Sequence, residues 1–353
     1  MQKKPIISRI IEGAKNCDPD PISSGYLEQK NTHNEMIVSS LSQPLVTVIM
    51  PVYNGARYVS EAIESILFQT YQNFELIIVN DGSNDDSKAV ITPYLKDLRI
   101  RYFEQCNAGV AAARNAAIKE SQGEFIGFLD QDDLWLPEKL ETQLQYFKKY
   151  QDISLIYSDY IIFSQLENSQ SFLSDIASFD PSLSDLKSIF IRNRIGVLTV
   201  LVKKQCIIDS GLLDTQLQGT DDYELWLRLA LDYKFLYIPL ALATYRWHGE
   251  NASNNELLMM IEETKAICTF LSKRPDAYDV LDIITTKLRL FDAYIKIGNI
   301  YGWIYKDRIN ARHFFFQALK QKPLHIEALK KYIKTFITPQ VSRFVVWQWQ
   351  KLN

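Results

Sequence analysis

Short apolar runs rich in β-branched residues alternate with amphipathic segments through the first half of this 353-residue chain. The runs typical of strands are 45–50, 74–79, 100–103 and 125–129. Segments with helical spacing of apolar residues separate them. Strands that alternate with helices of this length predict an α/β fold, with a mostly parallel sheet flanked by helices. Ligands of such sheets bind beyond the carboxyl ends of the strands, so we expect the polar residues there to line one crevice.

Three regions are predicted from changes of pattern along the chain. Residues 1–43 are polar with weak periodicity and are expected to form a mobile N-terminal arm. Residues 44–254 are expected to form the α/β domain, and 255–353 an all-helical extension. Later elements expected in the α/β domain are a helix at 137–150, strands at 153–157, 161–163, 195–202 and 235–245, and a covering loop at 166–186.

Composition argues against several classes of protein. The formal net charge is −3, so neither a nucleic-acid partner nor a basic membrane patch is expected. The four cysteines have no zinc-ligand or disulfide spacing. The sequence contains no apolar stretch typical of a transmembrane helix or signal peptide. We therefore expect a cytoplasmic protein.

The run 125–129 ends in Asp130-Gln131-Asp132-Asp133, three carboxylates within four residues. Because side chains alternate across a strand, Asp130 and Asp132 are expected on one side, while Asp133 turns away or begins the next turn. Two carboxylates this close repel each other unless a cation lies between them. A divalent ion held by one or two carboxylates and by substrate phosphates fits this pattern. The alternative is that the acids only end a strand and cap the next helix.

A second acidic pair, Asp221-Asp222, opens a predicted helix that continues through Glu224 and Trp226. Thr220 or Asp221 is the expected N-cap, and Glu224 is placed to complete a capping box with Asp221. A cap explains only one of the two acids, since one side chain occupies the cap position.

The helical extension contains small and aromatic residues at the spacing of a tetratricopeptide helix pair, with one extra residue in the turn. These residues are Gly298, Tyr301, Ala311, Phe315, Ala318 and Pro323. The pair is expected to cap the α/β domain, with docking of a protein partner as the alternative. The run 344–349 is expected to pack on the protein itself, with peripheral contact with a membrane as the alternative.

Four motifs resemble the family 2 glycosyltransferases of GT-A fold. In chain order they are Pro51-Val52-Tyr53-Asn54-Gly55, Val79-Asn80-Asp81-Gly82-Ser83, Asn107-Ala108-Gly109 with Ala113-Arg114-Asn115, and the segment from Gly123 to Asp133. The resemblance runs from about 45 to 253. It implies inverting transfer of a sugar from a nucleotide-sugar donor, with a divalent metal, Mn²⁺ or Mg²⁺, on the donor diphosphate.

The resemblance also implies a set of nucleotide-binding residues. These are Pro51, Tyr53, Asn54, Asp81, Asn107, Gly109, Arg114, Asp130 and Asp132. Tyr53 would face the base and Asp81 would accept a hydrogen bond from it. A carboxylate accepts from a base N–H but not from a carbonyl, which favours uracil or thymine over cytosine. A UDP-sugar is the favoured donor, with a dTDP- or GDP-sugar as the alternative. The structural alternatives are a core role for Tyr53 and a turn role for Asp81.

The remaining site residues follow from the same resemblance. The expected metal residues are Asp130, Asp132, Asp133 and His248, with a structural role as the alternative for His248. Asp222 is the expected general base, which takes the proton from the acceptor hydroxyl. Asp221 is the alternative, because the family usually has Glu at that position. Trp226 is expected to desolvate the base, and Arg246 to reach the diphosphate or the acceptor.

The acceptor is left open between a glycan, a lipid-linked molecule and a protein. A processive polysaccharide synthase is disfavoured, because Ala243 stands where its Gln-x-x-Arg-Trp motif needs Gln. A sugar nucleotidyltransferase would need a Gly-rich basic loop after the first strand, and 51–57 offers only Gly55 and Arg57. The last alternative is a catalytically inactive scaffold that acts through its helical C-terminus. The intact acids argue against it.

Overall fold

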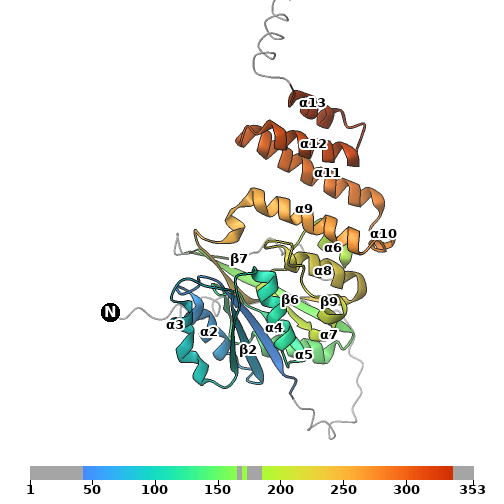
Figure 1. Ribbon diagram of the computed structural model, residues 1–353. Helices are drawn as coiled ribbons and strands as arrows, with labels where there is room; N and C mark the ends of the chain where they lie inside the picture. Colours follow the sequence, from blue (N-terminus) through green and yellow to red (C-terminus); the bar gives the residue numbers. More distant parts are fainter. Residues whose placement is uncertain (1–42, 165–168, 173–184, 337–353) are drawn as a thin grey trace, which may run out of the picture.

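The computed structural model describes residues 43–164, 169–172 and 185–336 (Figure 1). The predicted N-terminal arm, most of the predicted loop at 166–186 and the run 344–349 lie outside the described residues. The helices that are described include none with the length and apolar character needed to cross a membrane.

The described strands form one mixed sheet in the order β3-β2-β1-β4-β8-β6-β9-β5, with β7 paired to β6. Their bounds are β1 Val46–Val52, β2 Phe74–Asn80, β3 Ile100–Glu104, β4 Phe125–Phe128, β5 Leu134–Trp135, β6 Ile153–Ser164, β7 Ser169–Phe172, β8 Leu201–Lys203 and β9 Lys234–Trp247. β1 to β4 pair in parallel, and β8 is antiparallel to both β4 and β6. β6 and its parallel partner β9 therefore point the same way as β1 to β4. The predicted α/β class is confirmed.

Helices cover both faces of the sheet (Figure 1). Those of the α/β domain are α2 Val59–Leu67, α3 Ser87–Ile91, α4 Val110–Glu120, α5 Lys139–Lys149, α6 Leu186–Ile191, α7 Lys204–Asp209 and α8 Asp221–Asp232, with 3₁₀ turns η1 Thr92–Lys96, η4 Val197–Thr199 and η5 Ala252–Asn254. Successive side chains of β1 enter opposite cores: Val48 packs on the side of α2 and α5, and Ile49 on the side of α4 and α8. Both faces are buried, which explains why the strands are continuous apolar runs.

The strand predicted at 195–202 is wrong over most of its length, because residues 197–199 form η4 and only β8 follows as a strand. The Gly196 carbonyl accepts from both the backbone N–H and the hydroxyl of Thr199, at 2.9 and 2.7 Å. The Thr199 carbonyl in turn accepts from the buried side chains of Lys139 and Gln143, at 3.2 and 2.8 Å. These bonds satisfy the backbone without a strand partner.

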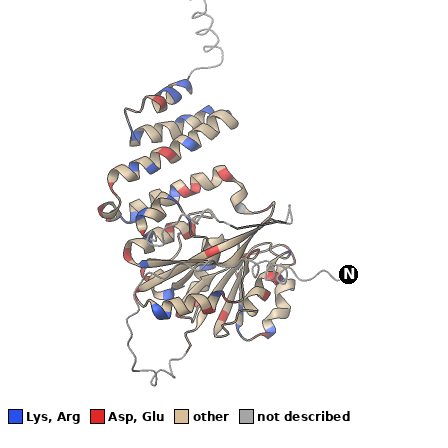
Figure 2. Cartoon of the chain, turned by 180° about the vertical axis from the view of Figure 1, so that it is seen from behind, with Lys and Arg blue, Asp and Glu red and all other residues tan. Residues whose placement is uncertain are grey.

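The C-terminal helices stack in a row that rises from the sheet (Figures 1 and 2). They are α9 Glu256–Lys273, α10 Ala277–Val280, α11 Ile283–Asn299, the π-helical turn η6 Ile300–Ile304, α12 Arg308–Gln321 and α13 Ile326–Lys334. α9 packs on α8, α11 on α9, α12 on α11 and α13 on α12. The predicted helical character of this region is confirmed over the described residues, which end at 336.

The residues with tetratricopeptide spacing lie at the contact between α11 and α12. Ala311, Phe315 and Ala318 are buried there, and Tyr301 stacks on Phe314 with 5.6 Å between ring centroids. A Cβ at Gly298 would lie 2.7 Å from the Phe315 ring. The small residue at 298 is therefore required for the two helices to approach.

We expect Gly298→Ala to lower the free energy of unfolding by about 1–2 kcal/mol, because overpacking costs more than the gain in helix propensity. Gly302→Ala is the matched control, since its Cβ would meet only Ala311, at 3.6 Å. The melting temperatures of the two variants, measured by thermal unfolding, check this prediction. A melting temperature of Gly298→Ala that equals or exceeds that of Gly302→Ala would contradict the packing described here.

Candidate active site

The side chain of Gln131 joins the turn after β1 to the turn after β4. Its Oε1 accepts from the Tyr53 N–H at 2.9 Å, and its Nε2 donates to the Tyr53 carbonyl at 3.0 Å. A Cβ at Gly55 would lie 2.2 Å from Oε1, so only glycine leaves room for this amide. Tyr53 is 46% exposed, so it is not a core residue. Gln131 was not predicted as a site residue, because nothing in the sequence distinguishes it from a residue that only separates Asp130 from Asp132.

Asp81 is buried and holds the segment that leads into α4. It accepts hydrogen bonds from the Gln105 side chain at 2.7 Å and from the N–H groups of Ala108 and Gly109, both at 2.9 Å. Gly109 has a φ of 90°, which glycine adopts without strain. Asn107 is exposed on the same segment. The structure thus gives Asp81 a positioning role, and its contact with a base stays a prediction.

Two other predicted nucleotide-binding residues have structural partners. The Asn54 N–H donates to the Ser83 hydroxyl at 2.9 Å, and the Asn54 side-chain oxygen accepts from the Asn84 N–H at 2.8 Å. Pro51 is buried within β1, opposite Val79 of β2. Asn54 therefore fixes the turn that carries Tyr53.

Arg114 of α4 connects the acids after β4 with the acids at the start of α8. Its guanidinium is 5% exposed and donates to Asp130 Oδ1 at 2.7 Å and to Asp221 Oδ2 at 3.0 Å. Asp221 is fully buried, and its second oxygen has no hydrogen-bond partner among the described residues. Burial raises the pKa of Asp221, and the charge of Arg114 opposes this rise. The arrangement brings Arg114, Asp130 and Asp221 together as one charged cluster.

Asp132 and His248 form a second polar contact at the same edge of the sheet. His248 Nε2 lies 3.0 Å from Asp132 Oδ2, and its Nδ1 accepts from the Glu250 N–H at 3.2 Å. The neutral ring therefore carries its proton on Nε2 and donates it to Asp132. Tyr58 stacks on the imidazole at 4.7 Å. Metal ligation through Nε2 would require the proton to move to Nδ1 and the bond from Glu250 to break.

The acids after β4 carry excess negative charge. Burial, with the nearby charge of Asp130, raises the pKa of Asp132. Asp133 is buried against β9, where it accepts from the Arg246 N–H at 2.9 Å, and its pKa is raised well above the ordinary value by burial and by the charges of Asp132 and Asp130. Asp130 and Asp132 retain exposed side-chain surface, 32% and 21%.

This turn can hold a divalent metal only as an open site. In the described part of the chain no three His, Cys, Asp or Glu side chains are grouped as a closed metal cage. Two partly exposed carboxylates with an unfavourable mutual charge nevertheless fit Mg²⁺ or Mn²⁺, which take one or two carboxylates and leave positions for phosphate oxygens. Asp130 and Asp132 are the residues placed for this, and Asp133 is directed to the backbone of β9.

Two predicted site residues lie in the protein interior. Arg246 is 1% exposed, with its guanidinium 2.6 Å from the Glu61 carboxylate and 5.0 Å from the centroid of the Tyr58 ring. Trp226 is fully buried and packs edge-on against Phe128 with ring centroids 6.1 Å apart. Both side chains support elements that carry the site, and their predicted contacts with ligands stay predictions.

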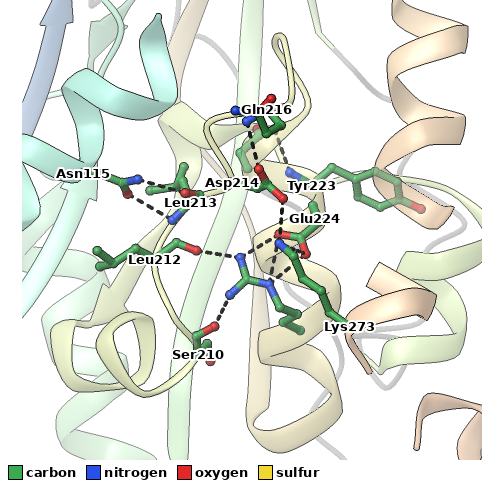
Figure 3. A network of polar contacts seen from close by, with 11 residues as sticks. Asn115, Ser210, Leu212, Leu213, Asp214, Gln216, Tyr223, Glu224 and Lys273 are labelled. Atoms are coloured by element: carbon green, nitrogen blue, oxygen red, sulfur yellow. Dashed lines mark hydrogen bonds and ion pairs between the residues drawn. The ribbon is translucent and has the colours of Figure 1, made fainter. Parts of the chain in front are cut away.

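The predicted capping box at the start of α8 is wrong. Thr220 is the N-cap residue and makes no side-chain capping bond. The Glu224 carboxylate accepts instead from Arg228, at 2.6 and 2.9 Å, and from Lys273 of α9 at 3.2 Å (Figure 3). A buried carboxylate needs paired cations more than a helix N–H, so Glu224 turns to them and leaves Asp221 free for Arg114.

The loop before α8 is fixed by the same network (Figure 3). Arg228 also donates to the carbonyls of Ser210 and Leu212, the latter at 2.6 Å. The Asn115 side chain of α4 bonds both the carbonyl and the N–H of Leu213, at 2.8 and 3.0 Å. α4 therefore positions the start of α8 through two consecutive residues, Arg114 and Asn115.

Asp222 is partly exposed at the wall of a cavity of about 1010 Å³ between α8, α9, α11 and the segment after α6. Polar and charged residues of this cavity include Arg192, Glu263, Arg289 and Lys296. Burial and the charge of Asp221 raise the pKa of Asp222 to about 7, although Arg114 opposes the rise. Such a carboxylate is suited to take a proton near neutral pH. Between the two acids, Asp222 faces open space and Asp221 is enclosed.

Solved structures share this fold. TarS 1-349 of S. aureus, in complex with UDP-GlcNAc, matches with a TM-score of 0.55 and 16% identity over 82% of this chain and 89% of that chain. The mannosyltransferase PcManGT from Pyrobaculum calidifontis, in complex with GDP-Man and Mn²⁺, matches with a TM-score of 0.53 over 82% of this chain and 87% of that chain, at 16% identity. The predicted GT-A fold is confirmed.

Sequence relatives show the family. The family model for glycosyl transferase family 2 matches residues 47–192. The glycosyltransferase RT0329 of Rickettsia typhi is 35% identical over 65% of this chain and 72% of its own length. The UDP-Glc:alpha-D-GlcNAc-diphosphoundecaprenol beta-1,3-glucosyltransferase WfgD of Escherichia coli is 33% identical over 60% of this chain and 81% of its own length. A Rickettsia bellii relative is matched over only 34% of its length. The chain belongs to glycosyltransferase family 2.

We expect Asp222→Asn to stabilise the protein more at pH 8 than at pH 5. Asp ionises near pH 4 in an unfolded chain but near pH 7 at this position. The folded state therefore binds more protons between these values, and stability falls as the pH rises through that window. The Asn side chain does not ionise, so Asp222→Asn removes this loss of stability at high pH. The measurement is the change in melting temperature at both pH values.

Asp86→Asn is the matched control, because this side chain is exposed in the turn before α3. It should change the melting temperature equally at the two pH values. An equal effect of Asp222→Asn at pH 5 and pH 8 would show that Asp222 does not titrate as described.

Proposed function

We propose that this protein is an inverting glycosyltransferase that moves a sugar from a nucleotide-diphosphate sugar to an acceptor held in the cavity at Asp222. The observation that carries the proposal is the Arg114 bridge. It joins Asp130, on the turn suited to a metal and diphosphate, to Asp221, the neighbour of Asp222. Inversion by direct displacement needs a base on the side of the sugar opposite the leaving diphosphate. Arg114 links the turn proposed to hold the diphosphate to the helix that carries the proposed base.

In the proposed step, the Asp222 carboxylate takes the proton of the acceptor hydroxyl while that oxygen bonds to the anomeric carbon. The bond from the anomeric carbon to the diphosphate oxygen breaks, and its electron pair leaves with the nucleoside diphosphate. Asp130 and Asp132 would hold Mn²⁺ or Mg²⁺, which when bound neutralises charge on the diphosphate. Arg114 keeps Asp130 and Asp221 in place without occupying the cavity.

A UDP-sugar is the favoured donor. Tyr53 exposes an aromatic ring beside the turn that Gln131 fixes, and such a ring can stack on a base. Two similar proteins are associated with a uridine donor: TarS is in complex with UDP-GlcNAc, and the name of WfgD specifies UDP-Glc. PcManGT, in complex with GDP-Man, supports the wider class of nucleotide-sugar donors, and its Mn²⁺ supports a metal here.

A lipid-linked diphosphate is the favoured acceptor among the three classes. The cavity next to Asp222 includes Arg192, Arg289 and Lys296, whose charges suit an anionic acceptor, although Arg289 also pairs with Glu263. The name of WfgD specifies a diphosphoundecaprenol acceptor. Both observations favour the same chemistry, a sugar joined to a diphosphate.

We expect Asp132→Asn and Asp222→Asn to separate donor binding from transfer. Asp132→Asn removes a charged ligand, so it should abolish the metal-dependent rise in melting temperature produced by UDP. Asp222→Asn should keep that rise and lower the transfer rate by about 10²–10⁴-fold. Asp86→Asn should leave both unchanged. Equal loss of nucleotide binding in both site variants would overturn the roles, and no response of the parent protein to any nucleotide with metal would favour the inactive scaffold.

We expect the rate of transfer to rise with pH and to level off above about pH 7, where Asp222 is ionised. The base must be deprotonated to accept a proton, so activity is lost as the pH falls below its pKa. A profile of kcat/KM against pH checks this, with nucleotide binding measured at each pH as the control. A rate that does not change between pH 5.5 and pH 8, taken with constant nucleotide binding, would count against Asp222 as the base.

A further inference from the structure

The last helices, α11 to α13, are strongly basic within a chain that is nearly neutral. Residues 283–336 contain eleven Lys or Arg and three Asp or Glu, a surplus of eight positive charges, although the whole chain has a net charge of −3. Lys and Arg are prominent on α12 and α13 (Figure 2). The total charge, on which the expectation of no basic membrane patch was based, therefore conceals a basic region of the chain.

Part of this charge surrounds a cavity of about 470 Å³ between η6, α12 and α13. Among the described residues, the charged side chains at the cavity are Arg308, Lys330, Lys331, Lys334 and the acid Glu327. Glu327 pairs with Lys330 at 2.8 Å. Lys331 donates to the neutral Asn299 side chain at 3.0 Å, and Lys334 lies 5.3 Å from the centre of the Trp303 ring. Glu327 cannot neutralise the three lysines Lys330, Lys331 and Lys334, so these lysines make the cavity attractive to anions.

Large apolar side chains are exposed beside this cavity. Trp303 is 70% exposed, and it is followed by Ile304 at 69% and Tyr305 at 60%, with Ile309 at 78%. Exposed aromatic and aliphatic residues next to Lys and Arg are typical of surfaces that rest in the interface of an anionic bilayer. A site for a soluble anion does not need exposed apolar side chains beside it.

The turn η6 connects this basic cavity with the cavity of Asp222. Ile300, at its start, lines the large cavity, whereas Gly302 and Trp303 line the basic one. A third cavity, of about 720 Å³, includes both Ile300 and Ile304 and reaches residues 249–258, which follow His248. If Trp303 contacts a membrane, the Asp222 cavity lies near the bilayer, because Ile300 and Trp303 belong to the same short turn.

We propose that the cavity between η6, α12 and α13 binds the phosphate of anionic phospholipids and docks this protein on an anionic membrane surface. The site is distinct from the acceptor cavity, and the inference holds whether or not the proposed transfer reaction is correct. Attraction by the basic residues brings the protein to the surface, and Trp303 and its neighbours then enter the interface.

The test is flotation of the full chain with vesicles of phosphatidylglycerol and phosphatidylcholine, and with vesicles of phosphatidylcholine alone. We expect binding to the anionic vesicles at low salt and weak binding to the neutral ones. The triple variant K330Q/K331Q/K334Q should lower the partition coefficient on the order of 100-fold, given the usual contribution of a basic residue near such a surface. Trp303→Ala should weaken binding at high salt as well.

The matched control is K119Q/K148Q/K149Q, which removes the same charge from exposed positions on α4 and α5. It should bind almost as the parent does. Equal loss in the two triple variants, or equal binding of the parent to both kinds of vesicle, would overturn the proposal. Binding of inorganic phosphate without binding of vesicles would also overturn the proposal, because it indicates a site for a soluble anion. A dimer that dissociates in K330Q/K331Q/K334Q but not in the control would overturn it too, because it indicates a contact between two copies of the chain.

Discussion

The buried guanidinium of Arg114 is the constraint on which the rest of this structure depends. A cation that is only 5% exposed must be neutralised, and its two carboxylates come from the end of β4 and from the start of α8. Removing one partner of such a cluster leaves an uncompensated buried charge, which is strongly destabilising. The requirement for charge balance inside the protein therefore also brings the two sides of the proposed reaction together.

The first half of the fold could be predicted because its signals are local. β1, β2 and β4 are buried on both faces, so their sequences are continuous β-branched or apolar runs. The segment 195–202 has the same composition, but contacts from Lys139 and Gln143 on α5 turn it into a 3₁₀ helix. Glu224 has the spacing of a capping residue, but its carboxylate pairs with Arg228, four residues later on α8, and with Lys273 of α9. Distant partners decide the first case, whereas in the second a local i,i+4 pair with Arg228 competes with the capping motif and the distant Lys273 adds to it.

The roles of the predicted site residues stay predictions, but the structure shows where these residues lie. The predicted acids do gather at one edge of the sheet, and Arg114 lies among them. The sequence could not show that Asp81 and Asp133 accept hydrogen bonds from backbone N–H groups, or that the Gln131 amide packs against Gly55. The basic surface was missed for another reason, since a total charge conceals opposite charges on separate regions. Counting charge by region would have found it.

The distribution of the site along the chain has a consequence for biosynthesis. A growing chain can complete β1 to β4 and the turn with Asp130 well before Asp221 is made, and Lys273, which pairs with Glu224, follows later still. Until then Arg114 has one of its two carboxylates, and Asn115 lacks the backbone of Leu213. A nascent or prematurely terminated product therefore contains the parts suited to a donor without the proposed base, and the proposed mechanism implies that it cannot complete a turnover on its own.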